Sequence, residues 1–420
     1  MRIVSAAAVR AGRIAPFALA IAGAEVVAAY AWSWAQEAFV SDLRGPDFFT
    51  YYAIARLQLV AGPAHAYDLG LQKQFQDQVT AQWPGHFILL PHILPPYFTL
   101  LLAPLGLVPF RAAYVVWSVV TAACVVGGVA AVMRAAGVAG RRAALLGLLV
   151  AAYLPTFVLL LQGQSDGPAL LGLGLSALAW TRGRHGAAGA AAALTLGKPH
   201  LLALLPVLFL VRGSWRALGA YLGSAALLVA VSLPWFGIEG WRDYVRLVAP
   251  WLFGGYPGFP VETQSLFSIR GVLDHLPIGP GVSLAVLAAL ALAVALAVLR
   301  GDPRPRLDFA LVVSASVALA AYAHTHDLVL LLVPSLLLAG ALLERQAARL
   351  KTGWIALAFS YAGVELYLQL GAVTAAAGVI ALAAYLLSER LTPVAPEPRP
   401  SSPTPRTPIE STASVAALPR

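Results

Sequence analysis

The sequence is poor in charge, in cysteine and in nucleotide-binding loops, and each shortage excludes a class of protein. Only 11% of the 420 residues are charged and 60% are hydrophobic, whereas about a quarter of an ordinary soluble domain is charged. The single cysteine, Cys124, excludes a disulfide framework and a cysteine-based metal site. The glycines form neither a Walker-type loop nor a dinucleotide fingerprint, so the sequence predicts no cytosolic nucleotide site.

Apolar segments long enough to enter a membrane are what the chain has in excess. About twenty apolar residues make one helical crossing of a bilayer, and a chain of this length has room for about ten or more. We therefore predict an all-α polytopic membrane protein in which residues 1–392 form one transmembrane domain. Its predicted spans, about twelve in number, lie at 14–35, 111–133, 143–161, 166–181, 186–197, 200–212, 216–235, 281–299, 307–323, 328–343, 354–370 and 372–388.

The positive charges predict an orientation in the membrane and no nucleic-acid surface. The net charge is +9, but the Lys and Arg residues stand singly or in small groups, and with these spans every group falls on one side. By the positive-inside rule that side is the cytoplasm, so both termini are predicted to be cytoplasmic. The tail at 393–420 is rich in Pro, Ser and Thr and is predicted to be disordered. The groups are Arg2/Arg10/Arg13, Arg134/Arg141/Arg142, Arg182/Arg184, Arg212/Arg216, Arg300/Arg304/Arg306, Arg345/Arg349/Lys351 and Arg390.

Three segments do not fit a simple span. Residues 86–110 are apolar but contain five prolines. We predict a re-entrant or interfacial element there, with an extra span as the alternative, because irregular backbone at membrane depth must be covered by protein or a wet cavity. Residues 36–85 and 236–280 are predicted to be long external loops. In the first loop, Phe48 to Val60 and Leu69 to Trp83 set aromatic and Leu side chains against Gln, Lys and Asp, which predicts interfacial helices.

A second set of polar residues gathers at the span ends opposite the cationic groups. Ionisable groups at membrane depth are costly and are therefore candidates for function. We predict that this non-cytoplasmic face carries the active site. The set comprises Asp42, Asp47, Gln162, Gln164, Asp166, Lys198, His200, Gln264, Ser265, Arg270, His324, His326 and Asp327.

Asp47 is the leading candidate in this set. It follows Gly45-Pro46 and precedes an aromatic segment that begins at Phe48. An Asp at such a junction is a common helix N-cap. A carboxylate on an external loop can equally accept a proton from an attacking hydroxyl, and the local sequence favours neither role.

Lys198 and the segment from His324 to Asp327 are the next candidates. Lys198 lies at the end of a short span, against the positive-inside trend, which either a snorkelling side chain or an anionic lipid headgroup explains. The histidine segment fits three structures: a polar turn in which Asp327 caps the next helix, a zinc site that lacks further ligands in the sequence, or imidazoles that donate to phosphate or accept a proton. We favour the last.

A series of short motifs runs in order through residues 45 to 330. It comprises Gly45-Pro46-Asp47, Tyr51-Tyr52, Tyr67-Asp68, Leu94-Pro95-Pro96-Tyr97, Pro104-Leu105, Trp117, Gln162-Gly163-Gln164, Leu196-Gly197-Lys198-Pro199, Gln264-Ser265-Leu266, and His324 with Asp327. This ordered series resembles glycosyltransferase family 87. The better-known members of that family are bacterial mannosyltransferases that use polyprenyl-phosphate-mannose and have the GT-C membrane fold. Two positions depart from the family pattern, Pro46 before the Asp and His326 in place of an aromatic residue.

The resemblance implies a GT-C-like bundle in a bacterial-type plasma (inner) membrane, with Asp47 and His324 as catalytic residues. Direct displacement by an acceptor hydroxyl then predicts inversion at the anomeric carbon. The expected partners are membrane lipid, a polyprenyl-phosphate-sugar donor and a lipid or glycan acceptor. We expect no cofactor, no metal and no nucleic acid. The residues expected to bind the donor phosphate or the substrate are Lys198, His326, Gln164, Ser265, Arg270, Tyr51 and Tyr52.

A transporter or flippase of a lipid-linked sugar is the main alternative. It predicts matched inverted repeats with broken helices in both halves, but the sequence has one strongly broken segment, at 91–96, and no clear counterpart. Glu25 and Glu365, which lie within apolar runs, would be its proton-relay candidates. A structural scaffold is a third possibility, but it leaves the outward Asp, Lys and His set unexplained.

Overall fold

The computed structural model is a bundle of helices, and the predicted all-α polytopic fold is confirmed. One antiparallel hairpin interrupts it, in which β1 (Gly255–Tyr256) pairs with β2 (Phe259–Pro260). The residues that the structure describes are 2–41, 47–81, 83, 88–250, 255–256, 259–260, 267–344 and 349–392. Asp42, Gln264, Ser265 and the tail at 393–420 lie outside them.

Helices of membrane length are separated by shorter helices and turns. The first part of the chain contains α1 (Arg2–Ala35), the π-helix η1 (Gln36–Val40), α2 (Phe48–Val60), the 3-10 helix η2 (Pro63–His65), α3 (Leu69–Thr80), α4 (Pro96–Leu102), η3 (Ala103–Leu107), α5 (Phe110–Ala135), α6 (Gly140–Ala152) and α7 (Leu154–Gln162). The middle contains α8 (Asp166–Thr181), α9 (His185–Ala192), η4 (Ala193–Gly197), η5 (Pro199–Leu201), α10 (Leu205–Val211) and α11 (Trp215–Val248). The last part contains α12 (Ile269–Leu273), α13 (Pro280–Arg300), α14 (Pro305–Ala318), η8 (Thr325–Leu331), α15 (Leu332–Leu343), α16 (Leu350–Glu365), α17 (Tyr367–Leu370) and α18 (Ala372–Leu391).

By length and composition, six helical segments of the described chain can cross a membrane. A seventh is possible if α6 and α7, which meet at an angle of 53°, form one bent span. The other predicted runs are helical over most of their length but shorter, so the number of about twelve spans stays a prediction. The six segments are Phe17–Val40, Phe110–Ala135, Trp215–Val248, Pro280–Arg300, Thr325–Leu343 and Ala372–Leu391.

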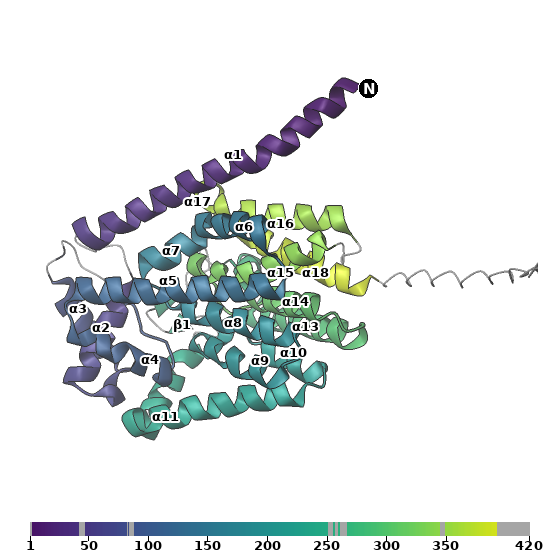
Figure 1. Cartoon of the computed structure of the whole chain (residues 1–420). Helices are drawn as coiled ribbons and strands as arrows, with labels where there is room; N and C mark the ends of the chain where they lie inside the picture. Colours follow the sequence, from purple (N-terminus) through teal and green to yellow (C-terminus); the bar gives the residue numbers. More distant parts are fainter. Residues whose placement is uncertain are drawn as a thin grey trace, which may run out of the picture.

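The bundle has an exposed helix at each edge and close-packed helices between them. In Figure 1, α1 lies along one edge, where it contacts α6 and α7, and α11 lies along the opposite edge. Between them, α5 and α8 approach so closely that a Cβ on Gly174 would lie 2.3 Å from the carbonyl oxygen of Gly128. Small residues allow this kind of backbone contact between membrane helices. It holds the second half of α8 against the later turns of α5.

The first predicted external loop contains the two predicted helices, α2 and α3. Most of α2 is buried within the protein, including Phe48, Tyr51, Ile54 and Leu57, whereas α3 leaves one face exposed. The second predicted external loop starts with a helical segment, because α11 continues to Val248 beyond a break at Gly237 (φ +63°).

The proline-rich segment forms no single helix of membrane length. Residues 88–95 are non-helical, and the chain then forms α4 and η3. Two glutamines of α3 satisfy the free backbone: Gln72 Oε1 accepts from the His92 N–H (2.8 Å), and Gln76 exchanges two hydrogen bonds with Leu90 (2.7 and 3.1 Å). Protein groups thus replace the water that this backbone would otherwise need.

Candidate active site

Five parts of the chain converge at one end of the bundle. They are the start of α2, the turn between α7 and α8, the start of α8, the turn between η4 and η5, and the start of η8. Helices α5 and α8 begin at this end and reach Arg134 and Arg182 at the other, so the polar set and these cationic groups lie at opposite helix ends, as predicted. The converging side chains are those of Asp47, Tyr51, Gln164, Asp166, Lys198, His324, His326 and Asp327.

Asp47 occupies the N-cap position of α2, but its side chain makes no capping hydrogen bond, so the N-cap role is wrong for its carboxylate. Instead Oδ2 accepts a hydrogen bond from Gln164 Nε2 (2.9 Å). Among the described residues, no hydrogen bond reaches Oδ1. Burial raises the pKa of Asp47, although the Gln164 hydrogen bond and the nearby His324 and Lys198 act in the opposite direction. A half-free carboxylate with a raised pKa is suited to accept a proton.

Gln164 is held in place by the turn that ends α7. Gly163 adopts a left-handed conformation there (φ +64°), and a Cβ on it would lie 2.8 Å from the Cβ of Phe48, so only glycine fits. Trp117 Nε1 donates to the carbonyl oxygen of Gly163 (2.8 Å), and the Tyr51 hydroxyl donates to Gln164 Oε1 (2.9 Å). Burial raises the pKa of Tyr51 to about 12, which keeps this hydroxyl a donor.

Lys198 lies between two carboxylates that are distant in the sequence. Its Nζ is 2.9 Å from Asp166 Oδ2 and 2.7 Å from Asp327 Oδ1. The three side chains are 10%, 0% and 2% exposed, respectively. Burial opposes the charged form, but the two carboxylates outweigh it and raise the pKa of Lys198. Two of the three N–H donors of the ammonium are thus used inside the protein, and no residue that the structure describes accepts from the third.

Asp327 joins the Lys198 pair to the histidines. Its Oδ2 accepts from the backbone N–H of His324 (2.7 Å), and its own N–H donates to the carbonyl oxygen of His324 (3.0 Å). His326 Nε2 lies 3.4 Å from Asp327 Oδ1, and Nδ1 lies within hydrogen-bonding distance (3.1 Å) of Gln162 Oε1. Asp327 therefore caps η8, one of the structures considered above, and also orients both histidines.

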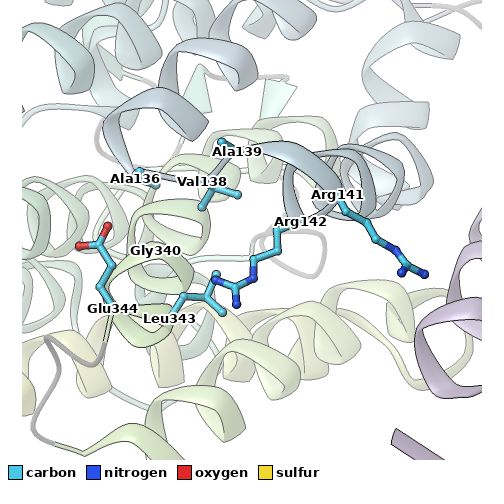
Figure 2. Close-up of a pocket in the computed structure, with 9 residues that line it drawn as sticks. Ala136, Val138, Ala139, Arg141, Arg142, Gly340, Leu343 and Glu344 are labelled. Carbon is cyan, nitrogen blue, oxygen red and sulfur yellow. The ribbon is translucent and has the colours of Figure 1, made fainter. Parts of the chain in front are cut away.

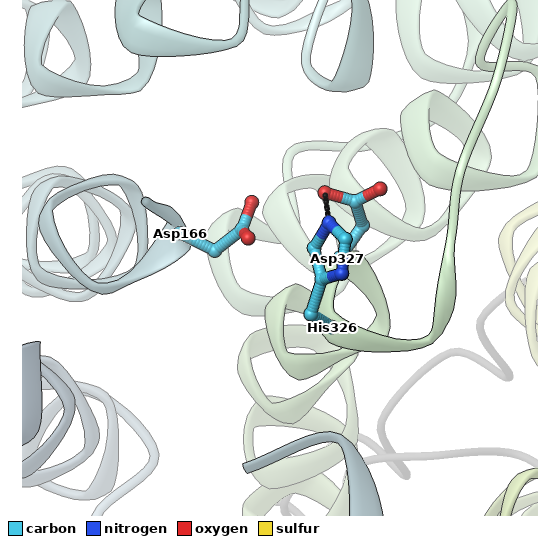
Figure 3. A group of neighbouring side chains, drawn as sticks. All are labelled: Asp166, His326 and Asp327. Carbon is cyan, nitrogen blue, oxygen red and sulfur yellow. Dashed lines mark ion pairs between the residues drawn. The ribbon is translucent and has the colours of Figure 1, made fainter. Parts of the chain in front are cut away.

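A metal-like ligand group overlaps this cluster. The ligand atoms of Asp166, His326 and Asp327 lie within 4.8 Å of one another. In Figure 3, Asp166 comes from the start of α8, and His326 and Asp327 come from the start of η8. The ammonium of Lys198 already contacts both carboxylates. A divalent cation would have to compete with that fixed positive charge, and the absence of a metal stays a prediction.

The remaining predicted substrate-binding residues are distributed unequally. The hydroxyl of Tyr52 donates to the carbonyl oxygen of Val108 (2.9 Å), so it holds the proline-rich segment and does not join the Asp47 hydrogen-bond network. Arg270 lies on α12, with Nε 3.5 Å from Asp274 Oδ2. Just before α12, the Phe267 N–H donates to the carbonyl oxygen of Ala323 (2.9 Å), which holds this segment next to the site. Ser265 lies outside the described residues.

Sequence reasoning missed two features near the site. It gave Lys198 no acidic partner, although Asp166 belongs to the same polar turn as Gln164. It also left out His92, which is buried with Nε2 2.8 Å from Thr99 Oγ1 and its ring 6.0 Å from that of Tyr51. The signal available was a histidine directly after Pro91, between the apolar runs of the proline-rich segment.

Glu365, the proton-relay candidate of the transporter hypothesis, has a structural role. Its Oε1 accepts from the backbone N–H of Leu154 (2.8 Å) at the first turn of α7, beside the break between α6 and α7. The first N–H groups of a helix have no partner within the helix. This carboxyl satisfies one of them.

Comparison with known proteins adds one match to this geometry. No curated protein and no solved structure matches the chain. A family model, Glycosyltransferase family 87, matches residues 93–322, which is more than half of the chain. The match includes Gln164, Asp166 and Lys198 and ends just before His324, while Asp47 precedes it. The chain belongs to glycosyltransferase family 87 and is a membrane glycosyltransferase, in agreement with the motifs that the site brings together.

Proposed function

We propose that the protein transfers a sugar, mannose above others, from a polyprenyl-phosphate-linked donor to a lipid or glycan acceptor on the non-cytoplasmic face of a bacterial-type plasma membrane, with inversion. One observation carries the proposal: the Asp47 carboxylate is half-buried, one oxygen is held by Gln164, and the other is free of partners among the described residues. Such a group accepts a proton from a hydroxyl placed beside it.

The reaction is a direct displacement at the anomeric carbon. The acceptor oxygen bonds to that carbon while the bond from the carbon to the phosphate oxygen breaks, and its electron pair leaves with the polyprenyl phosphate. The acceptor proton goes to Asp47 Oδ1. The phosphate leaves ionised, so it needs less protonation than the sugar oxygen that departs in glycoside hydrolysis.

The site supplies donors for the charge that grows on the phosphate. His324 lies close enough to Asp47 to affect its pKa, and Lys198 keeps one N–H beyond its two carboxylate partners. Donors fixed in advance toward a developing charge stabilise a transition state. We propose that His324 and the remaining N–H of Lys198 contact the donor phosphate, with His326 held by Asp327 and Gln162 beside them.

The surroundings favour a lipid-linked donor. The site lies at the ends of apolar helices and opposite the cationic groups Arg134 and Arg182. The positive-inside rule then directs it away from the cytoplasm, where nucleotide sugars are made. The described structure gives no particular support to transport, because Glu365 is engaged as a helix cap.

A donor competition tests the proposal. Purified protein in nanodiscs receives radiolabelled polyprenyl-phosphate-mannose or nucleotide-activated mannose, together with a membrane extract as the source of acceptors. We expect labelled product from the lipid-linked donor alone, with the anomeric configuration of the new bond opposite to that of the donor. Transfer from the nucleotide sugar, or retention of configuration, would contradict the proposal.

A further inference from the structure

A cavity lies at the other end of the bundle, at the turn between α5 and α6. Its volume is about 420 Å³, and its walls come from that turn and from the end of α15 (Figure 2). From Trp117 at the active site to Ala136 at this cavity, α5 rises about 28 Å. The cavity is therefore no part of the catalytic site. Its lining residues are Ala136, Gly137, Val138, Ala139, Arg141, Arg142, Gly340, Leu343 and Glu344.

Close backbone packing forms the floor of the cavity. A Cβ on Gly340 would lie 2.3 Å from the carbonyl oxygen of Ala136, so α15 contacts the last turn of α5 directly. Gly137 has a φ of +71°, and a Cβ there would lie 2.5 Å from Glu344 Oε1. Glycines thus allow the close backbone approach at both walls of the cavity.

The lining carries two positive charges that have no acidic partner in the described part of the chain. Arg141 and Arg142 are exposed, and neither forms an ion pair with any residue that the structure describes. The one carboxylate of the lining, Glu344, is paired with Arg306. Figure 2 shows Arg142 extending toward Leu343 and Arg141 pointing outward. The balance of charge in the cavity is therefore positive.

The backbone adds to the same potential. Arg141 and Arg142 occupy the first turn of α6, which contains no acidic residue, and the N-cap residue Ala139 offers no side-chain oxygen to the free N–H groups. The N-terminus of a helix is its positive end, where anions are stabilised and cations are not. Two arginines at this position add to the positive electrostatic potential of the helix N-terminus, and the sum favours the binding of an anion.

The depth and the apolar lining indicate what kind of anion enters. The cavity lies just beyond the ends of two membrane-length segments, Phe110–Ala135 and Thr325–Leu343, at the level where phospholipid headgroups meet the hydrocarbon core. Val138 and Leu343 line it beside the arginines. A ligand with a phosphate and an attached apolar part can pair its phosphate with the arginines and pack its apolar part against Val138 and Leu343.

We propose that this cavity, the α5–α6 pocket, binds the phosphate headgroup of an anionic membrane lipid. The phosphate lies between Arg142 and the start of α6, Arg141 approaches from the outer side, and the glycerol and upper acyl chain contact Val138 and Leu343. The pocket does not depend on the proposed sugar transfer. Its lipid contacts the ends of α5 and α15, which lead toward the catalytic end.

A matched pair of variants tests the α5–α6 pocket. The protein, purified in a neutral detergent, is titrated with phosphatidylglycerol, with phosphatidylcholine of the same acyl chains and with inorganic phosphate, and bound molecules are counted by native mass spectrometry. The test variant is Arg141→Gln/Arg142→Gln. The control, Arg182→Gln/Arg184→Gln, removes the same charge from the exposed α8–α9 turn, which does not line the pocket.

We expect the wild type and the control to bind phosphatidylglycerol equally, and the test variant to bind it at least about tenfold more weakly, which corresponds to 1.4 kcal/mol. Phosphatidylcholine is expected to bind the wild type no better than it binds the test variant. Equal losses in both variants would reduce the effect to surface charge and overturn the proposal. Inorganic phosphate that displaces the lipid at equal concentration would assign the pocket to a free anion instead. Each outcome is independent of sugar transfer.

Discussion

Replacing Lys198 by Met removes the positive charge between Asp166 and Asp327. The two ion pairs measure 2.9 and 2.7 Å, and all three side chains are at most 10% exposed. With both carboxylates ionised, the three groups carry a net charge of −1, and Lys198→Met changes that to −2 in a buried place. Removing one partner of a buried ion pair typically costs about 3–5 kcal/mol, because the other charge is left uncompensated.

A second substitution restores the balance. Lys198→Met/Asp166→Asn returns the net charge of the cluster to −1, so we expect it to recover most of the stability that Lys198→Met loses. Lys198→Arg keeps the charge but changes the geometry, and we expect an intermediate loss, since a planar guanidinium does not reproduce the donors of an ammonium.

Thermal unfolding of the purified variants in one detergent measures the stability, and transfer of radiolabelled mannose at equal protein abundance measures the activity. We expect recovery of the unfolding temperature in the double variant. If Lys198 also contacts the donor phosphate, as proposed, transfer stays low despite that recovery. A Lys198→Met protein as stable as the wild type, or a double variant no more stable than the single one, would refute the role of Lys198 as the internal counter-ion.

Three further predictions concern Asp47 and the residues around it. Gly163→Ala places a Cβ 2.8 Å from Phe48 at a φ of +64°, so we expect folding stability to fall by about 1–2 kcal/mol because of the left-handed backbone, and transfer to fall because Gln164 is displaced. Gly183→Ala, at a φ of +69° with no atom within 4 Å of the added Cβ, is the control for backbone strain alone. Equal transfer by both variants would contradict the reasoning. Because burial raises the pKa of Asp47, transfer should be present at neutral pH and should be lost on acidification at a pH above about 3.9, the pKa of an ordinary Asp. Gln164→Leu lacks the hydrogen bond that lowers this pKa, so its transfer should be lost at a higher pH still. A pH profile that is the same in both proteins would count against Asp47. Tyr51→Phe leaves Gln164 Oε1 without its 2.9 Å donor. Because an unsatisfied buried acceptor costs about 1–3 kcal/mol, we expect transfer to fall about tenfold or more. The control is Tyr52→Phe, which removes a hydroxyl bonded to Val108 and should keep wild-type transfer.

Much of the fold follows from the apolar pattern. The membrane-length runs are helical in the structure, and α2 ends at the predicted residue, Val60, because apolar periodicity and flanking Pro and Gly are local signals. The gathering of polar side chains at one end was also predictable, since it depends only on which span ends face the same side. The break between α6 and α7 has one local signal, Pro155 in the first turn of α7, but the carboxyl that stabilises it, Glu365, is more than 200 residues away.

The detailed geometry of the site depends on contacts that no local pattern contains. The N-cap and proton-acceptor roles of Asp47 have the same local sequence, and only the bond to Gln164, 117 residues away, separates them. Lys198 acquires its partners from 32 and 129 residues away. Tyr51 and Tyr52 are adjacent and of one type, yet successive residues on a helix point about 100° apart, so one faces Gln164 and the other faces Val108.

Transfer by Asp47→Asn is the measurement that tests the central claim most directly. Asn keeps the size of the side chain and an acceptor for the Gln164 amide, but it cannot take up the acceptor proton. The control is Asp68→Asn, in the same loop, where the side chain caps α3 through the Leu71 N–H (3.0 Å) and Asn caps equally well. With polyprenyl-phosphate-mannose as the donor and equal protein abundance, we expect Asp68→Asn to transfer like the wild type and Asp47→Asn to lose transfer by at least about a hundredfold, the usual contribution of a general base. Undiminished transfer by Asp47→Asn would contradict the account.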